Sequence, residues 1–282
     1  MSAPLIAAPE LIAALARQDQ DWLLIDCRFN LGNPAAGELA YALAHAAGAL
    51  YAHLDRDLSG AKTGRNGRHP LPTTETFVQT VRTWGITPGT RVVAYDDAGG
   101  MFAARLWWLL RFHGFDQIQV LDGGWQAWLA AQGPVDTASP ARQPSAFKAQ
   151  TRQDWLTDVE HVLAHLNQPG QQALIDARAA DRFRGENETM DAVGGHIPGA
   201  RNRFFQLNLQ ANGQFKPADQ LRDEFQALLG QTPMTAVVHQ CGSGVTACHN
   251  LLAMAHAGLP ATRLYAGSWS EWCSDASRPV ER

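Results

Sequence analysis

The chain of 282 residues carries the same sequence pattern twice. Residues 23–28 recur as residues 173–178, and residues 92–97 recur as residues 236–241. A repeat of this length indicates a duplicated structural unit that buries its own apolar core. The repeat therefore favours two domains of similar fold over one large domain.

Each copy alternates short apolar runs with stretches of helical character, which is typical of an α/β domain with a mainly parallel sheet flanked by helices. A helix is expected over residues 103–112 and its counterpart over residues 247–257, each followed by a glycine suited to end it. Residues 139–150 are rich in proline and small polar residues, as linkers are. We therefore expect a first domain over residues 1–138 and a second over residues 151–282.

A cysteine follows an apolar run in the second copy. Residues 236–240 predict a buried strand, Cys241 begins a tight loop that reaches Thr246, and a helix follows. Loop N–H groups and a helix N-terminus both favour negative charge, so they would stabilise a thiolate and an anion bound to its sulfur. Gly242 and Gly244 let the backbone turn tightly and approach a ligand. The pattern predicts a nucleophilic sulfur at Cys241, and its alternative is a small buried hydrophobic residue.

Composition limits the classes of function. The formal net charge of −4, without a basic block, argues against general nucleic-acid binding. No apolar run approaches the roughly 18 residues of a membrane span, and the N-terminus lacks the features of a signal peptide. Neither a disulfide framework nor a metal site is indicated by the spacing of the four cysteines, Cys27, Cys241, Cys248 and Cys273. We therefore expect reduced thiols in the cytoplasm and no structural zinc.

The tandem halves, the segment from Gly195 to Ala200 and the loop from Cys241 to Thr246 together resemble the rhodanese superfamily of two-domain sulfurtransferases. The resemblance covers essentially the whole chain, and the loop is similar to that of the 3-mercaptopyruvate branch. It implies that Cys241 takes a sulfane sulfur from 3-mercaptopyruvate or thiosulfate as a persulfide. The acceptor would be a thiol, cyanide or a thioredoxin-like protein. The resemblance implies no metal or organic cofactor, and the charge and the lack of a long apolar run predict no nucleic-acid or membrane partner.

The resemblance also implies roles for other residues. An aspartate, a histidine and the loop serine form a relay in the mercaptopyruvate branch, and these fall on Asp55, His69 and Ser243. Asp57 is an alternative to Asp55 as the aspartate of the relay. The alternative for His69 is a solvated loop histidine without a role in the relay. The loop residues expected to hold the thiolate and the persulfide are Gly242, Gly244, Val245 and Thr246.

The donor is an anion and needs cations. Arg182 matches the substrate arginine of the family, so the resemblance implies that it binds the donor's carboxylate or sulfonate. Arg184 is a second candidate for the substrate site, whereas Arg178 is expected to pair with acidic groups of its domain. The mercaptopyruvate branch has a second arginine where this chain has Asp191, and Arg184 or Arg201 is expected to supply the missing cation.

The donor preference follows from the loop. Asp191 resembles the thiosulfate branch, but that branch has cationic loop residues where this chain has Gly242 and Ser243. A neutral loop with a hydroxyl suits a carbonyl-bearing donor better than a dianion. We therefore expect 3-mercaptopyruvate as the donor, with a thiosulfate:cyanide sulfurtransferase as the alternative.

Two other classes of function are alternatives to sulfur transfer. A cysteine phosphatase or arsenate reductase needs an arginine six positions after the cysteine, where this chain has Ala247. A non-enzymatic sulfur carrier or sensor is a further alternative, and the intact loop with Arg182 favours turnover over it. In the first copy Asp97 takes the place of Cys241, so we expect that copy to be non-catalytic and to form a wall of the site.

Overall fold

The computed structural model describes residues 3–166, 168 and 170–282, and the chain divides into two compact units. Unit 1 comprises the chain up to Gly60, together with Pro72–Thr151 and Ala211–Phe215. Unit 2 comprises Ala61–Leu71, Arg152–Gln210 and Lys216–Arg282. Each unit thus contains a short segment from the other half of the sequence. The domains predicted over residues 1–138 and 151–282 do not include this exchange of segments.

The predicted linker belongs to unit 1, because its backbone is hydrogen-bonded there. Ser145 donates its N–H to the Arg82 carbonyl over 2.9 Å, and Gln150 donates to the His113 carbonyl over 2.9 Å. The segment runs along unit 1 without regular secondary structure.

The sheet of unit 1 has five parallel strands in the order β1-β6-β5-β2-β4. In chain order these are β1 (Leu5–Ile6), β2 (Asp21–Asp26), β4 (Leu50–Tyr51), β5 (Thr90–Tyr95) and β6 (Ile118–Leu121). A separate antiparallel pair joins β3 (His45–Ala46) to β7 (Val135–Asp136). The central strand β5 is almost entirely buried, as a parallel sheet covered on both faces requires.

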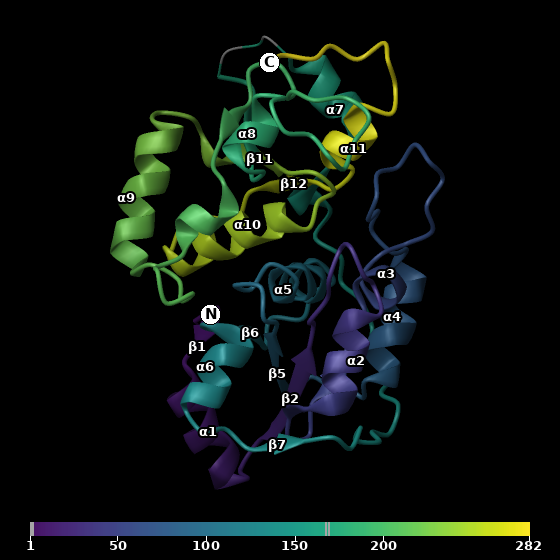
Figure 1. The fold of residues 1–282 in the computed structure, drawn as a ribbon, viewed down its shortest axis with the longest axis vertical. Helices are drawn as coiled ribbons and strands as arrows, with labels where there is room; N and C mark the ends of the chain where they lie inside the picture. The colour runs from purple at the N-terminus through teal and green to yellow at the C-terminus, as the bar shows by residue number, and fades with distance from the viewer. Residues whose placement is uncertain (1–2, 167, 169) are drawn as a thin grey trace. The chain divides into compact units, whose positions relative to one another are not determined.

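Helices cover both faces of this sheet, with α1 and α6 on one side and α2 and α4 on the other (Figure 1). The helices of unit 1 are α1 (Ala8–Arg17), α2 (Ala36–Leu43), α3 (Leu54–Asp57), α4 (Thr74–Thr83), α5 (Ala103–Phe112) and α6 (Gly124–Ala130). The helix expected over residues 103–112 is confirmed as α5. Gly114 follows it with φ +90° and donates its N–H to the Arg111 carbonyl, so it ends the helix as predicted.

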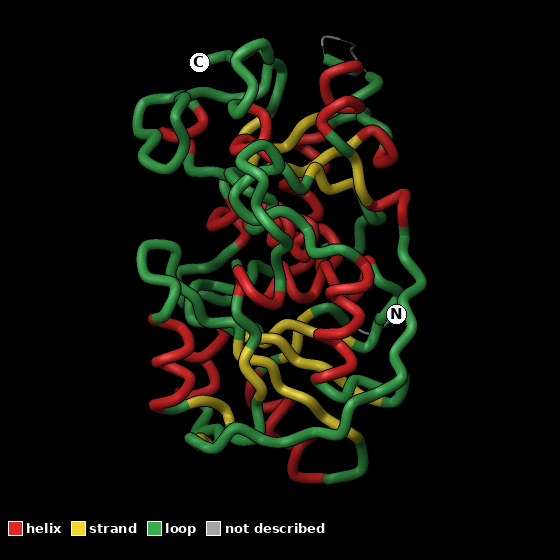
Figure 2. Tube along the Cα trace, turned by 90° about the vertical axis from the view of Figure 1, so that its right-hand side faces the viewer, coloured by secondary structure: helices red, strands yellow, loops and turns green. Residues whose placement is uncertain are grey.

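The sheet of unit 2 repeats this topology in the order β10-β9-β11-β12-β8, and all of its pairs are parallel. The strands are β8 (Leu156–Thr157), β9 (Ala173–Asp176), β10 (Arg201–Asn202), β11 (Val237–Gln240) and β12 (Arg263–Tyr265). The order matches β4-β2-β5-β6-β1 of unit 1 strand for strand, which confirms the predicted duplication. Figure 2 shows the strands of the two sheets in yellow, with helices in red beside them.

The helices of unit 2 are α7 (Val159–Ala164), α8 (Ala180–Phe183), α9 (Ala218–Leu229), α10 (Thr246–His256) and α11 (Ser268–Trp272). Short 3-10 turns occupy η1 (Gln153–Trp155), η2 (Phe205–Asn208) and η3 (Met234–Ala236). Val238 of β11 packs with Trp269 and Trp272 of α11 in one core cluster. On the opposite face of the strand, His239 contacts Met254 of α10. Among the described residues, no helix has the length and apolar character that a membrane crossing needs.

Candidate active site

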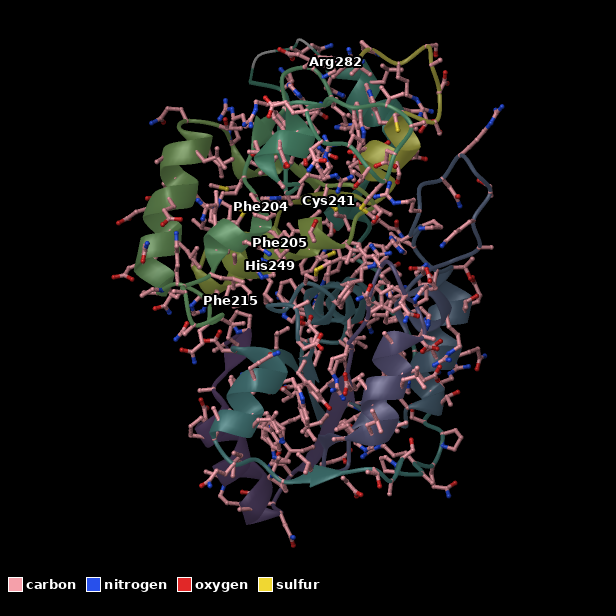
Figure 3. The ribbon with its side chains drawn as sticks, viewed as in Figure 1. Phe204, Phe205, Phe215, Cys241, His249 and Arg282 are labelled. Carbon is pink, nitrogen blue, oxygen red and sulfur yellow. The ribbon has the colours of Figure 1, made fainter. Side chains whose placement is uncertain are left out.

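Cys241 lies directly after the central strand of the unit 2 sheet (Figure 3). All four residues of β11 are buried, and α10 begins at Thr246, so the predicted strand, loop and helix are all present. Cys241 itself is 1% exposed. Ligands of open α/β sheets bind outside the carboxyl ends of the strands, which is where this sulfur stands.

The loop folds back so that one of its own N–H groups reaches the sulfur. Gly244 donates its backbone N–H to Cys241 Sγ over 3.1 Å. Gly244 has φ +78°, and a Cβ at this position would collide with the carbonyl oxygen of Ala266. Only glycine can therefore hold the backbone in the conformation that directs this donor at the sulfur.

The start of α10 also favours a negative charge at the Cys241 loop. Val245 is the N-cap residue, and no side chain caps the helix. The first N–H groups of a helix have no partner within it, and together with the helix dipole they favour an anion nearby. The loop thus suits a thiolate, and a persulfide anion that extends from it.

The backbone of Cys241 is fixed from α11. Its N–H donates to Ser268 Oγ over 3.1 Å, and its carbonyl accepts the N–H of Trp269 over 2.9 Å. Ser268 has the left-handed φ of +56°, and its counterpart Gly124 in unit 1 has φ +57°. Sequence reasoning missed Ser268, although the glycine in the first copy marks the same unusual backbone position.

His69 reaches the loop because its segment, Ala61–Leu71, belongs to unit 2. His69 Nδ1 lies 2.7 Å from Ser243 Oγ, and both side chains are buried. The predicted pairing of these two residues is thus present in the structure. Asp55, the third predicted member of the relay, lies on α3 of unit 1 and is half-buried. Its role, like that of the whole relay in catalysis, stays a prediction.

Arg182 lies on α8 and is held by two carboxylates. Its Nη2 is 2.8 Å from Glu188 Oε1 and 3.4 Å from Asp191 Oδ2, and its Nε donates to Glu188 Oε2 over 3.1 Å. Burial alone would raise the pKa of Glu188. Hydrogen bonds from Arg182 and from the N–H groups of Met190 and Asp191 outweigh burial and lower that pKa, so Glu188 stays ionised.

A second arginine shares this cluster. Arg68 donates Nη1 to Asp191 Oδ1 in an ion pair. A Cβ on Gly242 would lie 2.8 Å from Arg68 Nη2 and 3.6 Å from both Nη atoms of Arg182. Both guanidinium groups therefore border the residue next to the nucleophile. Sequence reasoning singled out Arg182 and missed Arg68.

The other predicted cations lie elsewhere. Arg178 donates Nε and Nη2 to Asp176 and stacks over Trp269 at 4.8 Å, which confirms its predicted pairing within the domain. Arg184 is exposed and pairs with Glu186 over 2.7 Å, so its role in substrate binding stays a prediction.

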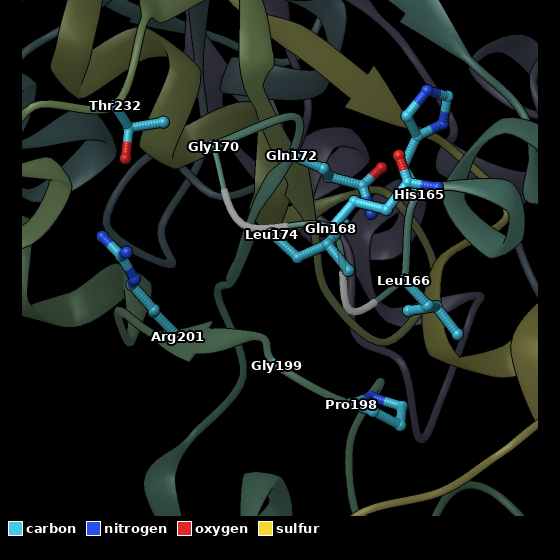
Figure 4. Close-up of a pocket in the computed structure, with 10 residues that line it drawn as sticks. All are labelled: His165, Leu166, Gln168, Gly170, Gln172, Leu174, Pro198, Gly199, Arg201 and Thr232. Carbon is cyan, nitrogen blue, oxygen red and sulfur yellow. The ribbon is translucent and has the colours of Figure 1, made fainter.

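A hollow in unit 2 holds Arg201, which donates Nη1 to the carbonyl of Leu228 over 2.7 Å (Figure 4). Gln172 and Leu174 of its lining lie at the start of β9, and Pro198 and Gly199 precede β10. These are the amino ends of the strands, whereas Cys241 follows a carboxyl end. Arg201 is therefore not the missing cation beside the nucleophile.

The strand register corrects the predicted counterpart of Cys241. Tyr95 pairs with Asp26 in unit 1, as Gln240 pairs with Asp176 in unit 2. The Asp96 carbonyl accepts the N–H of Trp125, as the Cys241 carbonyl accepts that of Trp269. Asp96, not Asp97, therefore stands in the place of Cys241. The sequence alignment was one residue off because two aspartates are adjacent and the loop lengths differ.

The described residues contain no group of three or more His, Cys, Asp or Glu side chains that could hold a metal ion. All four cysteines are free, and Cys248 is buried one turn into α10 with its Sγ 3.3 Å from the Gly244 carbonyl.

Comparisons with known proteins agree with this geometry. The rhodanese-like domain family matches the chain over residues 7–131 and 158–275. A Pseudomonas aeruginosa protein named probable 3-mercaptopyruvate sulfurtransferase is 47% identical over 281 residues, which cover 99% of this chain and 98% of that protein. Thiosulfate sulfurtransferase of Bos taurus is 39% identical over 209 residues, which cover 72% of this chain and 69% of that protein. In a solved structure, 3-mercaptopyruvate sulfurtransferase from Leishmania major matches 95% of this chain and 73% of its own with a TM-score of 0.83 and 32% identity.

Proposed function

We propose, since the chain belongs to the rhodanese family and is a sulfurtransferase, that it transfers sulfur from 3-mercaptopyruvate through a persulfide on Cys241. The observation that carries this proposal is the N–H of Gly244, which donates to Cys241 Sγ over 3.1 Å inside a buried loop. A donor already directed at the sulfur favours its ionised form without rearrangement of the loop. The 47% identity to the Pseudomonas aeruginosa protein supports the choice of donor.

The first half-reaction loads the sulfur. The Cys241 thiolate attacks the sulfur of the donor, and the carbon–sulfur bond breaks. The electron pair of that bond passes to carbon and gives the enolate of pyruvate. The enolate takes up the proton that the donor thiol loses, so pyruvate leaves and a Cys241 persulfide anion remains in the loop.

The second half-reaction unloads the sulfur. A thiolate or cyanide attacks the outer sulfur of the persulfide, and the sulfur–sulfur bond breaks. Its electron pair returns to Cys241 as the thiolate, which restores the starting state. Because all four cysteines are free, we place the reaction in a reducing compartment such as the cytoplasm, with a thiol or a thioredoxin-like protein as acceptor.

Ser243 and His69 would act on the carbonyl side of the donor. The Ser243 hydroxyl can donate a hydrogen bond to the developing enolate oxygen while His69, 2.7 Å away, supports it. Asp55 would orient His69 in this scheme. Thiosulfate has no carbonyl group, so its reaction would not need this pair.

Thiosulfate is the second candidate donor, and the 39% identity to the Bos taurus enzyme favours it. In that case the thiolate attacks the outer sulfur of thiosulfate, and sulfite leaves with the electron pair of the broken sulfur–sulfur bond. Arg182 would bind the sulfonate, as it would bind the carboxylate of 3-mercaptopyruvate.

The test is a comparison of kcat/KM for the two donors, joined to intact-protein mass spectrometry. We expect a larger kcat/KM with 3-mercaptopyruvate and a gain of about 32 Da after exposure to donor. The gain should be lost in Cys241→Ser and kept in Cys248→Ser, which alters the other cysteine of the loop and helix. A carrier or sensor would show the mass gain without turnover. A persulfide that persists in Cys241→Ser would refute the nucleophile.

A further inference from the structure

A histidine in the segment of residues 195–200 contacts the helix that carries Arg182. This segment contributes to the family resemblance, but it has no role in the proposed function. His196 Nδ1 lies 2.9 Å from the carbonyl oxygen of Phe183, and the two rings stack with their centroids 3.7 Å apart and an interplanar angle of 15°. Because a carbonyl oxygen only accepts, Nδ1 carries the proton in this bond. Phe183 is the last residue of α8 and directly follows Arg182.

The helix α8 depends on such outside support because it is a single turn. None of its four residues is buried, and no side chain caps its N-terminus. A helix this short is unstable by itself, since its few hydrogen bonds do not offset the entropy lost when the backbone is ordered. Contacts with the rest of unit 2 therefore decide where α8 lies, and with it the backbone of Arg182.

The contact between α8 and this segment is close, and the segment is fixed from two other sides. Gly185, two residues after α8, has φ +73°, and a Cβ there would lie 2.9 Å from the backbone N of Gly195. Arg178 donates Nη2 to the Gly195 carbonyl over 2.8 Å. His196 and Glu281 each donate a backbone N–H to the carbonyl of the other, over 2.8 and 3.0 Å. His196 is thus held in place before it contacts α8.

Unit 1 contains the same arrangement without a cation on the helix. His45 Nδ1 lies 2.7 Å from the carbonyl oxygen of Tyr41 on α2, and the rings stack at 3.8 Å with an angle of 10°. His45 pairs with Asp136 of β7 in an antiparallel ladder, as its counterpart in unit 2 pairs with the C-terminal segment. The residue before Tyr41 is Ala40, where α8 has Arg182. Both copies thus share the histidine contact, and only the second has an arginine beside it.

We propose that His196 is a positioning residue for substrate binding, which fixes α8 and so keeps Arg182 where it can bind the anionic group of the donor. The inference rests on the proposed function, because Arg182 is the cation assigned to the donor there. Ion pairs with Glu188 and Asp191 orient the end of the Arg182 side chain, whereas His196 fixes the backbone from which it extends. A shift of about 1 Å in that backbone would move the guanidinium group out of line with a bound donor. Binding would weaken while the chemistry at Cys241 stays the same.

The test is a double-mutant cycle on KM for 3-mercaptopyruvate with the variants His196→Ala and Arg182→Ala. We expect His196→Ala to raise KM about tenfold and to leave kcat within about threefold, since only binding is affected. In the Arg182→Ala background the same change should raise KM by no more than about twofold, because the residue through which it acts is gone. His196→Asn should restore part of the affinity, because its side-chain N–H can donate to the same carbonyl oxygen.

The matched control is His45→Ala, which removes the same contact from unit 1. Both histidine variants should lower the temperature of unfolding to a similar degree, and only His196→Ala should raise KM. Full additivity with Arg182→Ala, or an equal rise of KM in His45→Ala, would overturn the inference, because either result would point to a general loss of stability. If His196→Ala does not fold, as circular dichroism would reveal, His196→Phe takes its place, since it keeps the ring stacking and loses the hydrogen bond.

Hydrogen exchange gives a second measurement that needs no turnover. In His196→Ala the N–H groups of residues 183–186, which close the turn of α8, should exchange at least about tenfold faster, and those of α2 should not change. Unchanged exchange in α8 would also overturn the inference. Failure of the proposed function is a separate result: the unaltered protein would gain no mass on Cys241, and the exchange rates would still decide whether His196 holds α8.

Discussion

The loops that follow the central strands of the two sheets hold different negative groups with the same backbone design. In unit 1 the Asp96 carboxylate accepts four N–H groups, from Ala98, Gly100, Phe102 and Ala103, each over 2.8 Å. In unit 2 the equivalent Cys241 accepts the N–H of Gly244 over 3.1 Å. Both side chains are buried at the carboxyl end of a central strand.

The difference lies in what fills the loop. The Asp96 carboxylate is long enough to accept the loop N–H groups itself, so these groups are not available to a ligand. Burial raises the pKa of Asp96, and the four N–H groups lower it in part. The Cys241 side chain ends at its sulfur, which accepts one loop N–H group instead of four. The comparison teaches that one residue at the end of the strand decides whether this loop is a structural cap or a site for chemistry.

Cys241→Asp would make the second loop resemble the first. We expect turnover to fall by at least about 10⁴-fold, because a carboxylate cannot form a persulfide. The fold should persist, since the new carboxylate can accept the loop N–H groups as Asp96 does. Donor assays and thermal unfolding test this together. A variant that transfers sulfur would break the comparison.

Asp96→Ala tests the structural side of the comparison. It leaves four buried N–H groups without their acceptor, so we expect the free energy of unfolding to fall by about 3–5 kcal/mol. Asp97→Ala is the matched control, because Asp97 is exposed, and it should cost about 0.5 kcal/mol or less. Urea unfolding measures both. A larger loss in Asp97→Ala would favour the alignment that the register overturned.

Ser243→Ala separates the two donors. We expect kcat/KM for 3-mercaptopyruvate to fall about 10- to 100-fold, since the hydroxyl beside His69 is lost. Thiosulfate should be affected less, because it offers no carbonyl oxygen. Steady-state assays with both donors decide the point, and equal slowing would count against the relay.

The smallest predicted effect is the pH dependence of stability that His239 causes. The two central strands differ at this residue, because unit 1 has Ala94 at the equivalent position in the register. Burial lowers the pKa of His239 to about 3, below the value of about 6.5 for an unfolded chain. The unfolded state therefore binds one more proton between these values. The stabilising contribution is complete above about pH 6.5 and is lost as the pH falls, by about 1.4 kcal/mol per pH unit.

The measurement is the free energy of unfolding at pH 7 and pH 5. Between them the protein should lose about 2 kcal/mol that His239→Leu does not lose. Parallel loss in both proteins would mean that other groups cause the pH dependence.

The sequence alone was sufficient for the features that depend on local pattern. The duplicated strands, the loop at Cys241 and α5 follow from apolar runs and glycines, which act over a few residues. The pairing of His69 with Ser243 was reached only through the family resemblance, because a contact across 174 positions leaves no local signal.

The parts that sequence reasoning missed depend on tertiary packing. Arg68 lies 123 positions from Asp191, so no spacing rule could join them. The choice between Asp96 and Asp97 required the strand register, since either aspartate fits the pattern. The exchange of short segments between the units was not predicted, because chain segments of about ten residues can pack with the other half without any change in composition.

That exchange of segments has a consequence for how the protein can be divided. A fragment that begins at residue 151 contains the sulfur but leaves behind both His69 and Arg68, which unit 2 takes from the first half of the gene product. The two copies are thus no longer separable modules. Each half of the sequence supplies a segment to the unit that the other half builds, so we expect neither half to form its complete unit when it is expressed alone.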